Sequence, residues 1–327
     1  MCNILQPRLG YDTVRISLPL NNTDQRGTIR QMESFGDYSK KEYRNGTIRH
    51  TAKMNNLELF LSENRVSISG SFPKFVNGEN IIPFSITELK NGIEILSDTL
   101  NLGFSDAYVS RIDIATTLET DFAPQRYFEH LGSLGRCFRD VMRETTLQYS
   151  KGTKNNGLFK LMLYDKIREI QKNNKNTLID GNLLRIESRF ERKLSKQLQY
   201  PSVITAHTLT EPEFYNKCVD RFINDFNKIK KNYPLSNKSN VKMILENEVL
   251  TPSDIKNTLA KVAAKTFKND VLEWFENHNF KNRSDKQRAK GMLQGMLSDN
   301  ETSDYQNDLL NELELKVNNL KNCKVLM

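Results

Sequence analysis

Two segments of the sequence each place an arginine two residues before a carboxylate. Arg111 and Asp113 stand in YVSRIDIATTLET, and Arg185 and Glu187 stand in LLRIESRFE, where Arg189 follows. Both segments alternate polar and apolar residues, which is typical of a strand whose side chains point alternately to opposite faces. The pattern therefore predicts arginines and carboxylates together on one polar face. Carboxylates are ligands for hard divalent cations such as Mg²⁺ or Mn²⁺, and arginines bind phosphates.

A third segment adds a candidate nucleophile. In LFKLMLYDK, Lys160, Tyr164 and Lys166 share one strand phase, opposite the apolar residues. A phenol has an ordinary pKa of about 10, so it needs nearby positive charge to attack at neutral pH. Lys160, Lys166, Arg168 and a cation held by the two carboxylates would supply that charge. The three segments thus favour phosphoryl transfer by Tyr164, with Asp113 and Glu187 as metal ligands.

Other interpretations of these residues stay open. A solvated sheet face also carries opposite charges that pair across its strands. Tyr149, in LQYS just before the basic stretch, is an alternative nucleophile. Tyr164 is preferred because its strand phase and its lysine partner place it with the carboxylates.

The sequence lacks the residues that two other classes of protein need. Site-specific tyrosine recombinases require a His-x-x-Arg block, and none of the four histidines is followed by arginine at that spacing. Gly152 and Gly157 have the glycine spacing of a phosphate-binding loop, but Leu158-Phe159 follow in place of lysine and serine or threonine. A nucleotide hydrolase is therefore poorly supported.

The composition is that of a globular protein with a sizeable core. Of 327 residues, 37% are hydrophobic, with 17 phenylalanines and 11 tyrosines. No apolar run approaches the ~20 residues that span a bilayer, and the start has no basic segment followed by an apolar one. The four cysteines form no CxxC pair, which disfavours a zinc site or a disulfide framework. We expect a cytoplasmic protein without a membrane partner.

The positive charge is concentrated in one part of the chain. The formal net charge is +8, with 48 Lys and Arg against 40 Asp and Glu. Residues 151–196 hold twelve basic and five acidic residues, a net charge of +7. Such a segment favours a phosphate-rich partner, with nucleic acid first, although a solvated lysine and arginine face explains it equally well.

The hydrophobic pattern changes near Tyr200-Pro201, from strands to helices. The predicted strands are Thr13–Leu18, Leu57–Leu61, Arg65–Phe72, Tyr108–Thr120, Leu158–Asp165 and Leu183–Arg192. The predicted helices are Pro124–Arg143, which would cover one sheet face, and then Glu213–Lys230, Ser253–Asn277, Ser284–Leu297 and Asp304–Leu320. The chain is therefore predicted to be α+β, with a sheet domain over residues 1–200 and a helical accessory, DNA-binding domain over residues 201–327.

Three blocks together resemble the filamentous-phage gene II replication initiators and the related rolling-circle plasmid initiators. They are SRIDIA at 110–115, LYDKIREIQ at 163–171 and LLRIESRF at 183–190, in the same order as in that family. The upstream segment ISGSFPKFVNGEN, residues 68–80, resembles the family's Gly-Ser segment. The resemblance spans roughly residues 65–194.

The resemblance implies an endonuclease that nicks one strand of a double-stranded origin and becomes joined to the 5′ phosphate. Carried over block by block, Tyr164 is the nucleophile, Lys166 and Glu169 are further catalytic residues of its block, and Asp113 and Glu187 are the metal-binding carboxylates. Such initiators have a central antiparallel sheet with covering helices and bind origin DNA in double- and single-stranded form. The freed 3′-OH primes a host polymerase, and energy for unwinding DNA would come from a host helicase. Their related nucleases carry a His-hydrophobe-His pair, which this sequence lacks.

The basic side chains on the polar phases are the candidate DNA contacts: Arg111, Lys160, Arg185 and Arg189. The alternative function is a non-catalytic, sequence-specific DNA-binding protein of replication or regulation. In that case the helical half, with its basic segment KNRSDKQRAK at 281–290, would bind DNA and the sheet would be a scaffold.

Overall fold

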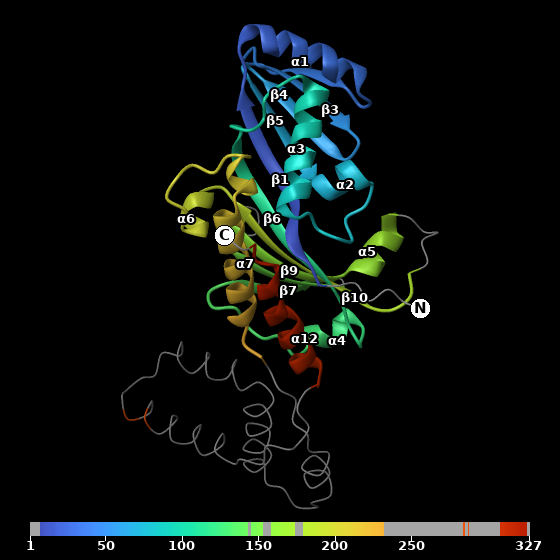
Figure 1. Ribbon diagram of the computed structural model, residues 1–327, viewed down its shortest axis with the longest axis vertical. Coiled ribbons are helices and arrows are strands. Elements are labelled where there is room, and N and C mark those ends of the chain that lie inside the picture. The colour runs from blue at the N-terminus through green and yellow to red at the C-terminus, as the bar shows by residue number, and fades with distance from the viewer. Residues whose placement is uncertain are drawn as a thin grey trace, which may run out of the picture.

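The computed structural model describes residues 7–142, 145–152, 158–173, 179–231 and 308–325, together with Ser284 and Gln287. These residues form a ten-stranded antiparallel sheet in the order β2-β3-β4-β5-β1-β6-β10-β9-β8-β7 (Figure 1). The strands are β1 (Leu9–Pro19), β2 (Ser39–Glu42), β3 (Ile48–Met54), β4 (Leu57–Ser62), β5 (Arg65–Ser71), β6 (Tyr108–Glu119), β7 (Phe138–Met142), β8 (Thr146–Lys151), β9 (Phe159–Asp165) and β10 (Leu183–Glu191).

Helices flank this sheet, and their ends follow local sequence signals. They are α1 (Asn22–Ser34), α2 (Phe72–Asn77), α3 (Ile86–Leu100), α4 (Pro124–Phe128), α5 (Lys166–Asn173), α6 (Leu194–Leu198), α7 (Pro212–Asn227) and α12 (Asp308–Asn319), with short 3₁₀ turns at Thr208–Thr210 and Leu320–Cys323. Asn21 caps α1, and Ser85 with Glu88 forms a capping box on α3. None of the helices in the described part of the chain is long and apolar enough to cross a membrane.

The two faces of the central strands are covered by different elements. On β10, Leu184, Ile186 and Phe190 point to one face, where Arg221 of α7 lies 5.4 Å from the Phe190 ring centroid. The polar phase of β10 points to the other face, where the chain after α2 crosses it: the carbonyl groups of Asn80 and Ile81 accept hydrogen bonds from that face. The polar phase is therefore partly enclosed by protein.

The predicted fold class is confirmed, and so are all six predicted strands, which lie within β1, β4, β5, β6, β9 and β10 or differ from them by one or two residues at an end. Two predicted helices also correspond to observed ones, Glu213–Lys230 to α7 and Asp304–Leu320 to α12. The sequence did not indicate α1, β2, β3, α3 or β8. The predicted helices at 253–277 and 284–297 fall outside the described residues, apart from Ser284 and Gln287.

The predicted helix Pro124–Arg143 is wrong beyond its first turns. Helix α4 ends at Phe128, and residues 138–142 form the edge strand β7. Gly135 has a φ of +48°, which breaks a helix, and the Arg139 guanidinium donates to the carbonyl groups of Phe128 and Leu131, each at 2.9 Å. The apolar residues are divided as a result, because Leu131 is buried while Phe138 is 64% exposed.

The predicted domain boundary at residue 200 cuts through a shared hydrophobic core. Phe214, Phe222 and Phe226 of α7 are fully buried in the same core as the sheet. Leu313 and Val317 of α12 join that core, and both helices lie against the sheet in Figure 1. The helices that the structure describes after residue 200 therefore pack against the same core as the sheet. The division of the chain at residue 200 stays a prediction, because most of residues 232–307 lie outside the described residues.

Candidate active site

Tyr164 lies near the end of β9, on the polar face of the sheet. The antiparallel register places it opposite Arg185 of β10, so Glu187 lies on the same face two residues along. The Tyr164 hydroxyl donates a hydrogen bond to Glu187 Oε2 at 3.2 Å. The structure thus places the predicted nucleophile in contact with a predicted carboxylate, as the alternation of polar residues along the two strands indicated.

Two carboxylates and two arginines form an ion-pair cluster next to this tyrosine. Arg189 donates from Nε to Asp113 Oδ2 at 3.0 Å and from Nη2 to Glu187 Oε1 at 3.1 Å. Arg111 donates from Nε to Asp113 Oδ1 at 2.8 Å and makes a second, closer contact through Nη2. Asp113 is fully buried, whereas both arginines retain some exposure. The arginines are therefore held with part of each side chain open to solvent.

Burial raises the pKa of both the Glu187 carboxyl and the Tyr164 phenol. Burial, together with the neighbouring Asp113 carboxylate, raises the pKa of Glu187 to about 8. Burial and the nearby Glu187 carboxylate raise the pKa of Tyr164 well above its ordinary value. The phenol is therefore protonated at neutral pH, and its activation needs additional positive charge or a proton acceptor.

A second polar network lies beneath Tyr164 and fixes the position of Arg185. Its guanidinium donates to Asp12 Oδ2 at 2.8 Å, to Thr117 Oγ1 at 2.9 Å and to the carbonyl groups of Asn80 and Ile81, both at 3.1 Å. The Arg185 side chain is 0% exposed. The predicted phosphate contact of Arg185 is therefore wrong, because a fully buried guanidinium with these acceptors cannot reach DNA.

Lys166 and Glu169 belong to this second network. Lys166 is the first residue of α5, where β9 has already ended, so its predicted place on the strand is wrong. Its buried Nζ donates to Asn80 Oδ1 at 2.7 Å and to Glu169 Oε2 at 2.6 Å. Burial and the Arg185 charge lower the pKa of Lys166. Glu169 also contacts Lys74 of α2 at 3.5 Å, so the pair ties α5 to α2.

Three functional candidates were missed in the sequence: Asp12, Asn80 and Ser71. Asp12 accepts hydrogen bonds from Ser71 and Asn80 as well as from Arg185. It stands where the pairing of β1 with β6 shifts register, between Tyr11 and Val14, and such a bulge redirects a side chain. Ser71 and Asn80 lie in the segment 68–80 that resembles the initiators, which was the available signal, whereas Asp12 had none.

Lys160 and Tyr149 have contrasting positions. Lys160 of β9 lies opposite Arg189 of β10. It is half-buried and makes no ion pair within the described residues. Tyr149 is fully buried on β8, and its hydroxyl donates to the Gly132 carbonyl at 2.7 Å. A phenol held in that way has no access to DNA, which favours Tyr164 as the nucleophile.

The chemistry of the carboxylate pair fits a magnesium-type ion only with help from the substrate. No group of three or more His, Cys, Asp or Glu side chains gathers at one point in the described residues. Mg²⁺ is commonly bound through one or two carboxylates together with substrate phosphates. Asp113 and Glu187 lie on adjacent strands and offer two such carboxylates, but each of their oxygens accepts a hydrogen bond from Arg111, Arg189 or Tyr164. A cation bound here would therefore displace some of these donors.

The Asp12–Arg185 pair predicts a large stability effect. In Arg185→Met the Asp12 carboxylate stays buried without its charged partner, and breaking a buried pair costs about 3–5 kcal/mol. Urea unfolding should report this loss at neutral pH. Burial alone would raise the pKa of Asp12, but the Arg185 charge and the hydrogen bonds from Ser71 and Asn80 lower it below its usual value. The stability that this carboxylate contributes is thus present above the pKa of an unfolded aspartate, about 4, and is lost as pH falls through the lowered folded value.

The matched control is the double variant Asp12→Asn with Arg185→Met, which removes both charges. It should be more stable than Arg185→Met alone, because no uncompensated buried charge remains. Equal unfolding midpoints for wild type and Arg185→Met would show that the pair does not hold the site together.

Comparisons with known proteins assign the chain to a family. The family model for the N-terminal part of the phage gene II replication-associated protein matches residues 11–211, which include every site residue discussed above. A solved structure, the rolling circle replication initiator protein from Geobacillus stearothermophilus, aligns at 9% identity with a TM-score of 0.37, over 77% of this chain and 95% of that one. A comparison with curated proteins found no match. The family match covers more than half of the chain and confirms the resemblance described above, and the chain therefore belongs to the gene II family of replication-associated proteins.

Proposed function

We propose that this replication initiator nicks one strand of its origin DNA through Tyr164. The observation that carries the proposal is the hydrogen bond from the Tyr164 hydroxyl to Glu187, beside a cluster of partly exposed arginines. The phenol oxygen attacks the phosphorus, a 5′-phosphotyrosine bond forms, and the bond to the 3′ oxygen breaks. Because the ester conserves the energy of the broken linkage, the strand can be rejoined without ATP.

The residues around Tyr164 divide this work. The hydrogen bond to Glu187 Oε2 orients the phenol and offers its proton a path away from the oxygen. Arg111 and Arg189, held by Asp113, would bind the phosphate oxygens as charge builds on them, and Lys160 would extend the contact along the strand. The Lys166–Glu169 pair acts as a positioning element that anchors α5 to Lys74 of α2 and to Asn80.

Asp113 and Glu187 would hold the divalent cation, Mg²⁺ or Mn²⁺, with the DNA phosphate completing the site. When bound, the cation would supply positive charge beside the phenol and the scissile phosphate. The partners we propose are double- and single-stranded origin DNA, a host helicase for unwinding and a host polymerase that extends the freed 3′-OH.

A metal requirement follows from this arrangement. Nicking of a supercoiled origin plasmid should stop in EDTA and return with Mg²⁺ or Mn²⁺, while Glu187→Gln should lower the rate by about 100-fold or more, since it removes a charged ligand. The measurement is conversion of supercoiled to nicked circles on an agarose gel. Full activity in the chelator would mean that Arg111 and Arg189 supply the positive charge without a metal.

A further inference from the structure

The hairpin formed by β2 and β3 carries a cluster of exposed cations at the end of the sheet opposite β7. Every residue of β2 is exposed, because β2 is the last strand of the sheet. Lys40, Lys41, Arg44 and Arg49 are all exposed on this hairpin. None of these four makes an ion pair within the part of the chain that the structure describes. Their charges are therefore available to an external partner.

The register of the hairpin places like charges opposite one another. Lys41 pairs directly with Arg49 across the two strands. The Tyr43 ring lies close to both, with its centroid 5.2 Å from Lys41 Nζ and 5.4 Å from Arg49 Cζ. Like charges that face each other destabilise a pair of strands, although an aromatic ring offsets part of that cost. An anionic partner that bridges the two cations would remove the repulsion.

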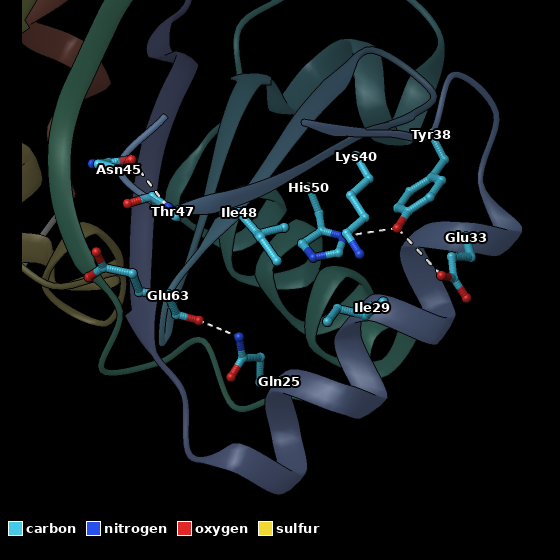
Figure 2. A pocket seen from close by; sticks show the side chains of 11 residues that line it. Gln25, Ile29, Glu33, Tyr38, Lys40, Asn45, Thr47, Ile48, His50 and Glu63 are labelled. Atoms are coloured by element: carbon cyan, nitrogen blue, oxygen red, sulfur yellow. Dashed lines mark hydrogen bonds between the residues drawn. The ribbon is translucent and has the colours of Figure 1, made fainter. Parts of the chain in front are cut away.

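The hairpin is held in shape by its turn and by helix α1. Tyr43 and Thr47 close the turn with a backbone hydrogen bond of 2.9 Å, and Gly46 supplies a φ of +79°. Figure 2 shows Tyr38 pointing toward His50 and Glu33, with a hydrogen bond of 2.8 Å between the Tyr38 hydroxyl and His50 Nδ1. Tyr38 thus links Glu33 of α1 with His50 of β3, beside a hollow of about 680 Å³ that both elements line. The cations are thus presented on a pre-formed support.

The strand registers give the separation between this hairpin and the proposed nucleophile. Arg49 pairs with Ser62, Ser62 pairs with Arg65, and Arg65 pairs with Pro19 at the end of β1. Arg49 therefore lies at the same height in the sheet as Pro19. Tyr164 pairs with Arg185, and Arg185 pairs with Thr117, next to the residue of β6 that pairs with Leu9. Tyr164 therefore lies at the height of the opposite end of β1. Six strand spacings of about 4.8 Å and ten residues of about 3.3 Å, taken at right angles, give a separation of roughly 44 Å. One turn of B-DNA is about 34–36 Å, so the two sites are about one and a quarter turns apart on one duplex.

We propose that the β2–β3 hairpin binds the phosphate backbone of the origin duplex roughly one and a quarter helical turns from the bond that Tyr164 cuts. This inference rests on the proposed function. Two-stranded β-ribbons fit the major groove of DNA, and lysines and arginines that neutralise phosphates release counterions. The hairpin would hold the duplex flank while the distant active site works on the nicked strand.

The test substitutes three of these cations and measures binding to DNA of arbitrary sequence. The variant is Lys41→Gln, Arg44→Gln and Arg49→Gln; the matched control is Lys90→Gln, Lys228→Gln and Lys321→Gln, three exposed lysines on other elements. The probes are a fluorescent 30-base-pair duplex and its single strand, titrated at several salt concentrations. We expect the hairpin variant to lose about tenfold or more in duplex affinity at 0.1 M salt, with the log–log salt slope reduced by about 2–3.

Each outcome of this experiment bears on the hairpin and not on the cleavage chemistry. Unchanged duplex affinity, an equal loss in the control, or a loss confined to the single strand would overturn the proposal. A variant that aggregates while its DNA affinity is retained would show that the cations only protect a sheet edge. Thermal melting should show no loss of stability, because the substitutions remove a like-charge pair. Tyr164→Phe should bind the duplex normally, so failure of the nicking proposal would be seen separately.

Discussion

Replacement of Tyr164 by phenylalanine is expected to abolish both strand cleavage and the covalent protein–DNA adduct. The substitution removes only the hydroxyl oxygen, which makes a hydrogen bond to Glu187 Oε2 and is the atom proposed to bond to phosphorus. The rate should fall to the uncatalysed background, a loss of at least about 10⁴-fold, since the oxygen proposed to form the ester is missing. The measurement is plasmid nicking together with detection of the adduct on a denaturing gel.

The fold should tolerate this change, because the side chain is only half-buried and its ring remains. Circular dichroism and duplex affinity should match those of wild type. The matched control is Tyr149→Phe, which removes a hydroxyl bound to the Gly132 carbonyl and should keep its nicking activity. Cleavage by the Tyr164 variant at the wild-type rate would show that another residue is the nucleophile.

Truncation after Pro201 is expected to unfold the sheet domain. The fragment lacks α7, whose Phe214, Phe222 and Phe226 are fully buried against the sheet. Each buried phenylalanine contributes about 1.5–3 kcal/mol, so the loss of three removes about 5–9 kcal/mol. That is comparable to the whole stability of a typical domain, about 5–15 kcal/mol.

Thermal unfolding followed by circular dichroism would measure this effect. The full chain should unfold cooperatively, whereas the fragment ending at Pro201 should show no cooperative transition. A folded fragment that still cleaved a single-stranded origin oligonucleotide would support the domain boundary at residue 200 and would contradict the shared core.

The candidate site could be predicted from sequence as far as it depends on strand periodicity. A period of two places Asp113, Glu187 and Tyr164 each on the polar side of its own strand, and the antiparallel register then brings these sides onto one face of the sheet. The same argument could not tell which polar side chains of that face are enclosed. Arg185 and Arg189 share a phase, yet Arg185 is fully buried because residues 80 and 81 cross over it, whereas Arg189 keeps part of its side chain exposed.

The contacts that sequence reasoning missed are those between distant parts of the chain. Asp12 and Arg185 are separated by 173 positions, and only the fold brings them to 2.8 Å. The Pro124–Arg143 prediction failed for a related reason. Its apolar spacing fits a helix, but the Arg139 contacts and the turn at Gly135 favour a strand that pairs with β8. In this segment tertiary contacts overrode the local helical periodicity.

The most direct test of the account identifies the residue that is joined to DNA. Wild-type protein is reacted with a supercoiled origin plasmid, the adduct is digested with trypsin and nuclease, and the modified peptide is sequenced by mass spectrometry. The predicted peptide is LMLYDK, residues 161–166, with a nucleotide phosphate on Tyr164. A modification on ETTLQYSK, residues 144–151, would place the nucleophile at Tyr149 and contradict the proposed active site.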